Sequence, residues 1–257
     1  MISLKGKNVF VTGASSGIGK ATAELFASEG ANLIICARRI DRIEKFAEEL
    51  NSKYGVPVYF DKLDVRNRVE VEKFIDNIPA EFRTIEILVN NAGLALGYAE
   101  FQDDKVESWE TMLDTNVKGL LYVTKKVVSI MIENRKGHII NLGSIAGHEA
   151  YPKGSVYCAS KHAVAAITRS LRMDLIDKNI RVSSVDPGMV ETEFSNVRFY
   201  GNNEKADNVY KGINPLKPQD IAEAILFCAT RPPHANINEM IIMPSVQANA
   251  FVTYRKN

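Results

Sequence analysis

Short runs of apolar, mostly β-branched residues alternate along this chain with longer stretches of helical periodicity. The apolar runs fall at residues 8–11, 33–36, 56–60, 85–89, 138–142, 180–185 and 239–243. They show no strict alternation of apolar and polar positions, which is typical of strands buried on both faces, as in a parallel sheet. Pro57 makes the third run the weakest of the seven, because proline cannot donate to a strand ladder. We therefore expect seven strands in one parallel sheet.

The stretches between these strands have the period of amphipathic helices. They cover residues 17–28, 40–53, 66–77, 108–133, 156–177 and 219–229. Strand–helix alternation implies right-handed crossovers, which place helices on both faces of a doubly wound sheet. The pattern predicts a single-domain α/β Rossmann fold over residues 1–257.

The stretch from about 190 to 218 has no clean period and carries charges, aromatic residues and glycines. Long irregular segments in compact domains are usually functional or mobile. We interpret this stretch as a lid over a substrate site, and a plain surface excursion is the alternative.

Composition narrows the classes of function. The 257 residues include 32 Lys and Arg against 31 Asp and Glu, a formal charge of +1. Nucleic-acid binding requires a clear basic excess, so we expect no nucleic-acid partner. No apolar run is long enough to span a membrane, and no signal peptide is recognisable. The three cysteines lack C-x-x-C spacing, which favours a cytoplasmic protein without disulfides, and no metal site is expected.

The first predicted strand runs into a glycine-rich turn that ends in the first predicted helix. Glycine allows a tight turn and lets a phosphate approach the free N–H groups of a helix N-terminus. The spacing is G-x-x-x-G-x-G, which differs from the standard G-x-G-x-x-G fingerprint. We predict that a dinucleotide binds here through Gly13, Ser15, Ser16, Gly17, Ile18 and Gly19.

The end of the second predicted strand indicates which dinucleotide binds. NAD sites usually carry an acidic residue here for the ribose 2′-hydroxyl, whereas arginine accommodates a 2′-phosphate. This chain has Arg38 and Arg39 and no carboxylate at that point. Guanidinium groups bind phosphate in a bidentate manner, so we predict NADP as the cofactor. A solvated start of the next helix is the alternative interpretation of the two arginines.

Two further loops follow predicted strands. Asp64 is expected to accept a hydrogen bond from the adenine amino group, with the N–H of Val65 beside it, or to cap the next helix. The tetrapeptide after the fourth strand lies where the strand order of such a sheet reverses, the usual place for ligands. It consists of Asn90, Asn91, Ala92 and Gly93.

Four polar residues suit carbonyl–alcohol chemistry. Tyr157 and Lys161 are four positions apart in a predicted helix and so share a face. Hydride transfer to a carbonyl needs a proton donor, and the reverse reaction needs a base. A nearby ammonium favours the phenolate of a tyrosine, so Tyr157 is the candidate acid and base, with Lys161 as its support. Ser144 is expected to bind the substrate oxygen, and Asn116 to hold a water that links Lys161 to solvent.

Taken in order, these motifs resemble the short-chain dehydrogenase/reductase family over nearly the whole chain. The matching segments are residues 12–19, 90–93 and 186–188, together with Asn116, Ser144, Tyr157, Lys161 and Thr192. The resemblance implies a Rossmann fold, NAD(P)-dependent hydride transfer and the four catalytic roles given above. It also implies that the stretch containing Pro187, Gly188, Val190 and Thr192 contacts the nicotinamide.

A narrower resemblance is visible in residues 66–68, 94–97, 143–147 and 193–199. They are similar to the branch that includes NADP-dependent serine 3-dehydrogenase, L-allo-threonine dehydrogenase and 3-hydroxy acid dehydrogenase. This branch implies serine, allo-threonine, 3-hydroxypropionate or 3-hydroxyisobutyrate as substrates, and a homotetramer. The carboxylate of such a substrate needs a cation, and Arg198 in the predicted lid is our candidate.

Two alternatives remain from the sequence. One is an NADPH-dependent reductase of other carbonyls, such as a 3-ketoacyl thioester, a ketone or an aldehyde. The other is a non-catalytic dinucleotide sensor on the same fold. A sensor would be free to lose Tyr157 or Lys161, and both are present.

Overall fold

The computed structural model describes residues 2–256 and contains one seven-stranded, all-parallel sheet. Its strands are β1 (Asn8–Thr12), β2 (Asn32–Ala37), β3 (Val58–Lys62), β4 (Ile85–Asn90), β5 (Gly137–Leu142), β6 (Ile180–Pro187) and β7 (Glu239–Ile242). Their order across the sheet is β3-β2-β1-β4-β5-β6-β7. The direction of winding reverses between β1 and β4, so the sheet is doubly wound and the predicted Rossmann fold is confirmed.

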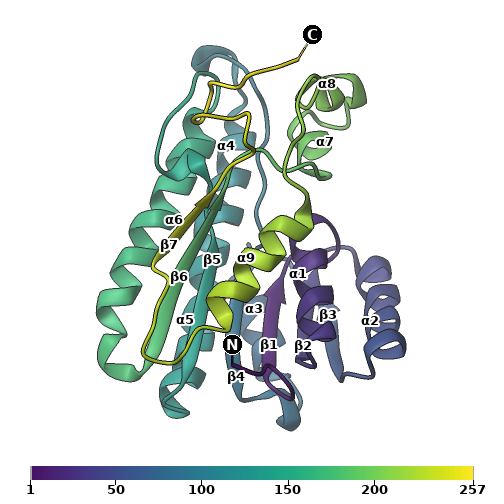
Figure 1. The fold of residues 1–257 in the computed structure, drawn as a ribbon, viewed down its shortest axis with the longest axis vertical. Coiled ribbons are helices and arrows are strands. Elements are labelled where there is room, and N and C mark those ends of the chain that lie inside the picture. The colour runs from purple at the N-terminus through teal and green to yellow at the C-terminus, as the bar shows by residue number, and fades with distance from the viewer. Residues whose placement is uncertain (1, 257) are drawn as a thin grey trace.

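Helices cover both faces of the sheet. On one face lie α1 (Gly17–Ser28), α2 (Ile40–Tyr54) and α9 (Pro218–Ala229), with α1 packed beside α9 (Figure 1). On the other face lie α3 (Arg68–Asp76), α5 (Leu120–Glu133) and α6 (Ser155–Asp174). A further helix, α4 (Val106–Leu113), packs against α6. None of the helices within residues 2–256 combines the length and apolar character that a membrane crossing needs.

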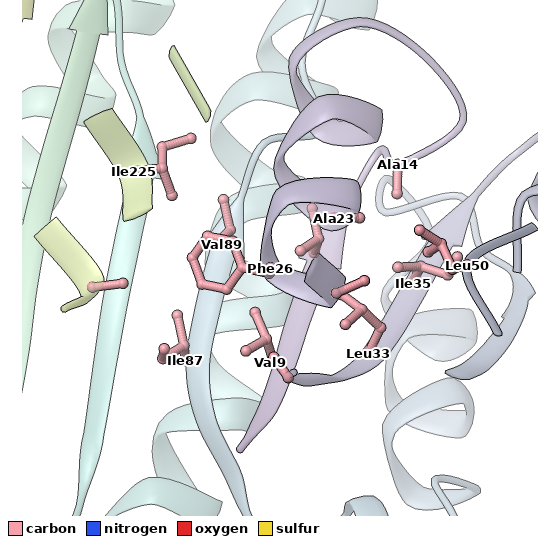
Figure 2. Close-up of a cluster of buried hydrophobic side chains, with 14 of the residues drawn as sticks. Val9, Ala14, Ala23, Phe26, Leu33, Ile35, Leu50, Ile87, Val89 and Ile225 are labelled. Carbon is pink, nitrogen blue, oxygen red and sulfur yellow. The ribbon is translucent and has the colours of Figure 1, made fainter. Parts of the chain in front are cut away.

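The core explains why the strands lack apolar–polar alternation. Figure 2 shows Phe26 and Ala23 of α1 against the sheet, beside Val9 of β1, Val89 of β4 and Ile225 of α9. These five side chains are fully buried. A second buried cluster fills the opposite face, so both sides of each central strand exclude water. Burying one large apolar side chain stabilises the fold by about 1.5–3 kcal/mol, so these two layers hold the strand ends in place.

The predicted helix over residues 108–133 is three pieces in the structure. Helix α4 ends at Leu113, a π-helical turn covers Asp114–Gly119, and α5 continues from Leu120. Turns of this kind insert an extra residue and are frequently found at functional sites. This one carries Asn116, a predicted site residue.

The segment from about 190 to 218 contains two short helices, α7 (Phe194–Arg198) and α8 (Asn203–Asn208). Figure 1 shows them together at the end of the molecule toward which the strand arrows point. A parallel bridge between Val190 and Leu216 closes the base of this segment. The predicted lid is therefore a folded excursion over the carboxyl ends of the strands.

Candidate active site

A cleft of about 320 Å³ lies at the carboxyl ends of the strands and extends under α7. Its volume falls within the range of small-molecule sites. Most of the residues predicted from the sequence line it: Gly13, Ser15, Ser16, Gly17, Ile18, Arg38, Arg39, Asp64, Val65, Asn91, Ala92, Gly93, Ser144, Tyr157, Lys161, Pro187, Gly188, Val190 and Thr192. Four predicted residues do not: Gly19, Asn90, Asn116 and Arg198.

The glycine-rich turn has the shape that a phosphate-binding turn requires. Gly13 and Gly17 have φ of +69° and +55°, a region that side chains other than glycine rarely adopt. Ser16 caps α1 without a side-chain hydrogen bond to the first turn, so the first N–H groups of α1 are free to bind an anion. These residues fit the pyrophosphate of a dinucleotide.

Gly19 lies behind this turn and keeps two backbone segments close together. A methyl group there would lie 2.5 Å from the Gly13 carbonyl oxygen and 2.3 Å from Nδ2 of Asn91. The same Asn91 amide donates to the carbonyl of Thr12, which ties the loop after β4 to the loop after β1. Gly19 therefore shapes the turn without touching the cleft.

Replacing Gly19 by Ala is expected to destabilise the protein and weaken binding of NADP. Overpacking of this kind costs about 1–3 kcal/mol, which lowers Tm by several degrees in a protein of this size. Differential scanning calorimetry and NADPH fluorescence titration measure the two effects. Lys20→Ala, one position along on the partly exposed surface of α1, should change neither by much. An unchanged Tm in Gly19→Ala would show that the turn relaxes freely.

Basic and hydroxyl groups gather where a 2′-phosphate is expected. One terminal nitrogen of Arg39 donates to the hydroxyls of Ser15 and Ser16, at 3.1 and 2.9 Å. The other donates to Glu193 at 2.9 Å, and Arg42 donates to the same carboxylate at 2.8 Å. Hydrogen bonds from these two arginines hold the pKa of Glu193 below its usual value, against the effect of burial. Glu193 precedes α7, so this ion pair connects the lid to the cofactor end of the cleft.

Asp64 is in place at the adenine end, and its carboxylate binds Arg66. The Arg66 guanidinium donates to both oxygens at 2.5–3.0 Å. Partial burial would raise the Asp64 pKa, but these hydrogen bonds outweigh it, and the pKa lies below its usual value. The predicted capping role is wrong, because the side chain of Asn67 caps α3 by accepting from the N–H groups of Val69 and Glu70.

Asn90 is buried beneath the cleft. Its amide donates to Thr124 at 2.8 Å and to Asn141 at 2.9 Å, which links β4 to α5 and β5. The next residue, Asn91, lines the cleft. The structure therefore separates the predicted tetrapeptide into a structural first residue and three cleft residues.

Tyr157, Lys161 and Ser144 meet in the cleft, as the sequence predicts. All three are buried, with 9, 7 and 8% of their surfaces exposed. Nζ of Lys161 donates to the carbonyl of Leu142 at 2.9 Å, which fixes the ammonium beside the end of β5. The ring of Phe194, from the lid, packs edge-on against that of Tyr157 at 5.7 Å. The predicted lid is thus in direct contact with the predicted catalytic tyrosine.

Burial controls the ionisation of these groups. It raises the pKa of Tyr157, and the nearby Ser144 hydroxyl and Arg198 guanidinium act in the opposite direction. Burial also lowers the pKa of Lys161 to about 8, against the influence of Asp186. With its pKa raised in this way, the phenol of Tyr157 is protonated at neutral pH.

Asn116 lies behind the cleft and is 2% exposed. Its Oδ1 accepts from the N–H of Leu94 at 2.9 Å, and its Nδ2 donates to the carbonyl of Leu94 and to Ser160. The π-helical turn aims this side chain at the loop after β4 and at α6. Asn116 thereby fixes Leu94, a cleft residue, and the predicted water beside Lys161 remains a prediction.

Arg198 ends α7 and lies close to Tyr157, the predicted catalytic tyrosine. Its guanidinium carbon is 5.8 Å from the centre of the Tyr157 ring and 5.6 Å from that of Tyr151. Its Nε donates to the carbonyl of Gly97, whose N–H donates back to the carbonyl of Arg198. The guanidinium is thus held beside the reacting end of the cleft.

Several cleft residues were not predicted. They are Cys36, Ala37, Leu63, Leu94, Thr115, Leu142, Gly143, Glu193, Phe194 and Val197. Strand-end residues such as Leu63 and Leu142 could have been found from their position, because strands β1 to β6 end at the cleft. The lid residues had no such signal, since α7 has no visible period.

The chain matches the family model of short chain dehydrogenases over residues 7–202. It therefore belongs to the short-chain dehydrogenase/reductase family and is an oxidoreductase of that family.

Individual relatives agree with this assignment. The chain is 49% identical over 257 residues to the NADP-dependent 3-hydroxy acid dehydrogenase of Schizosaccharomyces pombe, covering 100% of this chain and 99% of that protein. It is 45% identical to sulfoacetaldehyde reductase 2 of Chromohalobacter salexigens, covering 96 and 98%. The closed form of a serine dehydrogenase complexed with NADP+ superposes with a TM-score of 0.90 at 43% identity, covering 97% of this chain and 99% of that one. The predicted cofactor agrees with the first and third of these proteins.

Proposed function

We propose that this protein transfers a hydride between NADP and the 3-hydroxyl of a small 3-hydroxy acid or amino acid. Its cofactor is NADP, for which the glycine-rich turn, Arg38 and Arg39 provide the site. The observation that carries the substrate class is the position of Arg198, 5.8 Å from the Tyr157 ring. A substrate whose hydroxyl lies at Tyr157 has its carboxylate within reach of this guanidinium.

Each residue at the reacting end of the cleft has its own role in the reaction. Bound NADP supplies the hydride acceptor or, when reduced, the donor. Tyr157 holds the proton that the substrate oxygen gains or loses, and Ser144 donates a hydrogen bond to the same oxygen. Lys161, held by the Leu142 carbonyl, places a positive charge near the phenol and favours its deprotonated form. Phe194 and Val197 of the lid exclude water from this end of the cleft.

Replacing Arg198 by Ala is expected to raise KM for 3-hydroxypropionate by about 10–100-fold, because one charge-assisted hydrogen-bonded contact is lost. NADP binding, at the other end of the cleft, should remain unchanged. Steady-state kinetics with NADP and fluorescence titration of NADPH measure the two quantities. Lys205→Ala, on the exposed surface of α8, is the matched control. Equal KM values in Arg198→Ala and the parent protein would contradict the proposed carboxylate contact.

A second candidate is the reduction of an aldehyde that bears another anionic group. The relative named sulfoacetaldehyde reductase 2 and the same guanidinium favour it. Serine, allo-threonine, 3-hydroxypropionate, sulfoacetaldehyde and an acetoacetyl thioester, each assayed with NADP(H) and NAD(H), separate the candidates. The finer expectations of serine or allo-threonine as substrate, a homotetramer and a cytoplasmic location belong to this proposal and rest on the family resemblance.

A further inference from the structure

A buried acid lies directly behind the catalytic residues. Asp186, near the end of β6, has a side chain only 4% exposed. One of its oxygens accepts from the Ser184 hydroxyl, and the other contacts Nε2 of His148 at 2.8 Å. His148 follows the short helix after Ser144, and its side chain is 18% exposed. The pair therefore connects the interior of the site to solvent.

Three consecutive residues place this pair next to the catalytic groups. Leu142 accepts the hydrogen bond from Lys161. Gly143 follows, and a methyl group there would lie 1.8 Å from Oδ1 of Asp186, so the carboxylate is pressed against the backbone. Ser144 comes next and lines the cleft. The Asp186 carboxylate thus packs against Gly143. This glycine lies between Leu142, which accepts the Lys161 hydrogen bond, and Ser144.

The charged groups around the pair are few. Helix α6 contributes Lys161, Tyr157 and Arg169, and β7 contributes Glu239, which binds Arg169 at 2.8 Å. Glu149, beside His148 in the chain, accepts from the N–H of Ala250. Glu239 is already paired with Arg169, so Asp186 is the anion that acts on the Lys161 ammonium. In agreement with this, the charge of Asp186 raises the pKa of Lys161.

We propose that Asp186 and His148 are positioning residues for Lys161: the buried Asp186 carboxylate is the counter-charge of the Lys161 ammonium, and His148 holds that carboxylate against the backbone of Gly143. A permanent cation in place of His148 would compete with Lys161 for this carboxylate. This inference rests on the proposed catalytic role of Lys161 only for its effect on turnover.

Competitive acetylation of Lys161, followed against pH by mass spectrometry in protein without added NADP, measures its titration directly. Asp186→Asn is expected to lower the Lys161 pKa by about one unit, because a nearby opposite charge is removed. His148→Arg places a permanent cation beside Asp186 and should also lower the Lys161 pKa. The comparison is with His148→Gln, whose side chain can donate a hydrogen bond to Asp186 but carries no charge. His162→Gln is the control, since His162 is exposed and faces the carbonyl of Cys158.

The outcomes separate the inference from the proposed function. Equal titration of Lys161 in His148→Arg and His148→Gln, or an unmoved titration in a folded Asp186→Asn, overturns the inference. If Asp186→Asn does not fold, the two His148 variants decide, because that side chain is partly exposed. The alkaline limb of kcat/KM for 3-hydroxypropionate oxidation should move with the labelling curve. If the labelling curve of Lys161 shifts and the alkaline limb of kcat/KM does not, the action of Asp186 and His148 on Lys161 is supported. The catalytic role of Lys161 is then contradicted.

Discussion

Replacing Tyr157 by Phe is expected to lower kcat for 3-hydroxypropionate oxidation by about 10²–10⁴-fold, the usual contribution of a positioned acid or base. The substitution removes one hydroxyl from a buried ring and leaves its packing against Phe194 intact. KM and NADPH binding should therefore change little, which stopped-flow single-turnover kinetics and fluorescence titration can establish.

Tyr151→Phe is the matched control for this experiment. Tyr151 is a second, partly buried phenol near Arg198, and burial raises its pKa as well. It does not line the cleft, so loss of its hydroxyl should leave kcat within a few-fold of the parent value. A Tyr157→Phe variant with normal kcat would remove Tyr157 from the mechanism and revive the non-catalytic alternative.

The double variant Arg38→Ala, Arg39→Ala is expected to lose about 10²–10⁴-fold in affinity for NADP and only a few-fold for NAD. Each charge-assisted contact to a phosphate contributes about 1.5–3 kcal/mol, and NAD lacks the group that receives it. Isothermal titration with both dinucleotides measures the ratio. Lys45→Ala is the control, because Lys45 lies on the exposed surface of α2 and does not line the cleft.

Losses of equal size for NADP and NAD would give the two arginines a different role. Arg39 also links Ser15 to Ser16, so its removal could disturb the glycine-rich turn that both dinucleotides share. The comparison of the two cofactors therefore distinguishes phosphate recognition from support of the turn.

Local sequence patterns predicted the parts of the site that local chemistry specifies. The glycine-rich turn, the arginines after β2 and the Tyr157–Lys161 spacing each lie within a few residues of a strand end or on one helical turn. The π-helical turn around Asn116 escaped prediction, because one extra residue only shifts the phase of a continuous apolar pattern.

Long-range partners escaped prediction for a different reason. Asn90 reads as a loop residue, yet its amide partner Asn141 is on another strand 51 positions away. Glu193 meets Arg39 across 154 positions, and His148 meets Asp186 across 38. A single sequence contains no signal for such pairs, since each of these side chains alone resembles an ordinary polar or charged surface residue. Only the fold brings them together.

On the proposed 2′-phosphate contact, the ion pair of Glu193 with Arg39 couples NADP binding to the contact between the predicted lid and the cofactor end of the cleft. The guanidinium of Arg39 is one of the two groups expected to bind the 2′-phosphate, the other being that of Arg38, and the Glu193 carboxylate is one of its partners in the structure. The two equilibria are reciprocal: the factor by which bound phosphate weakens the Glu193–Arg39 ion pair is also the factor by which the ion pair weakens phosphate binding. Arg42 makes this competition weaker, because Arg42 donates its own hydrogen bond to Glu193 at 2.8 Å. Glu193 therefore keeps one partner when Arg39 binds the phosphate.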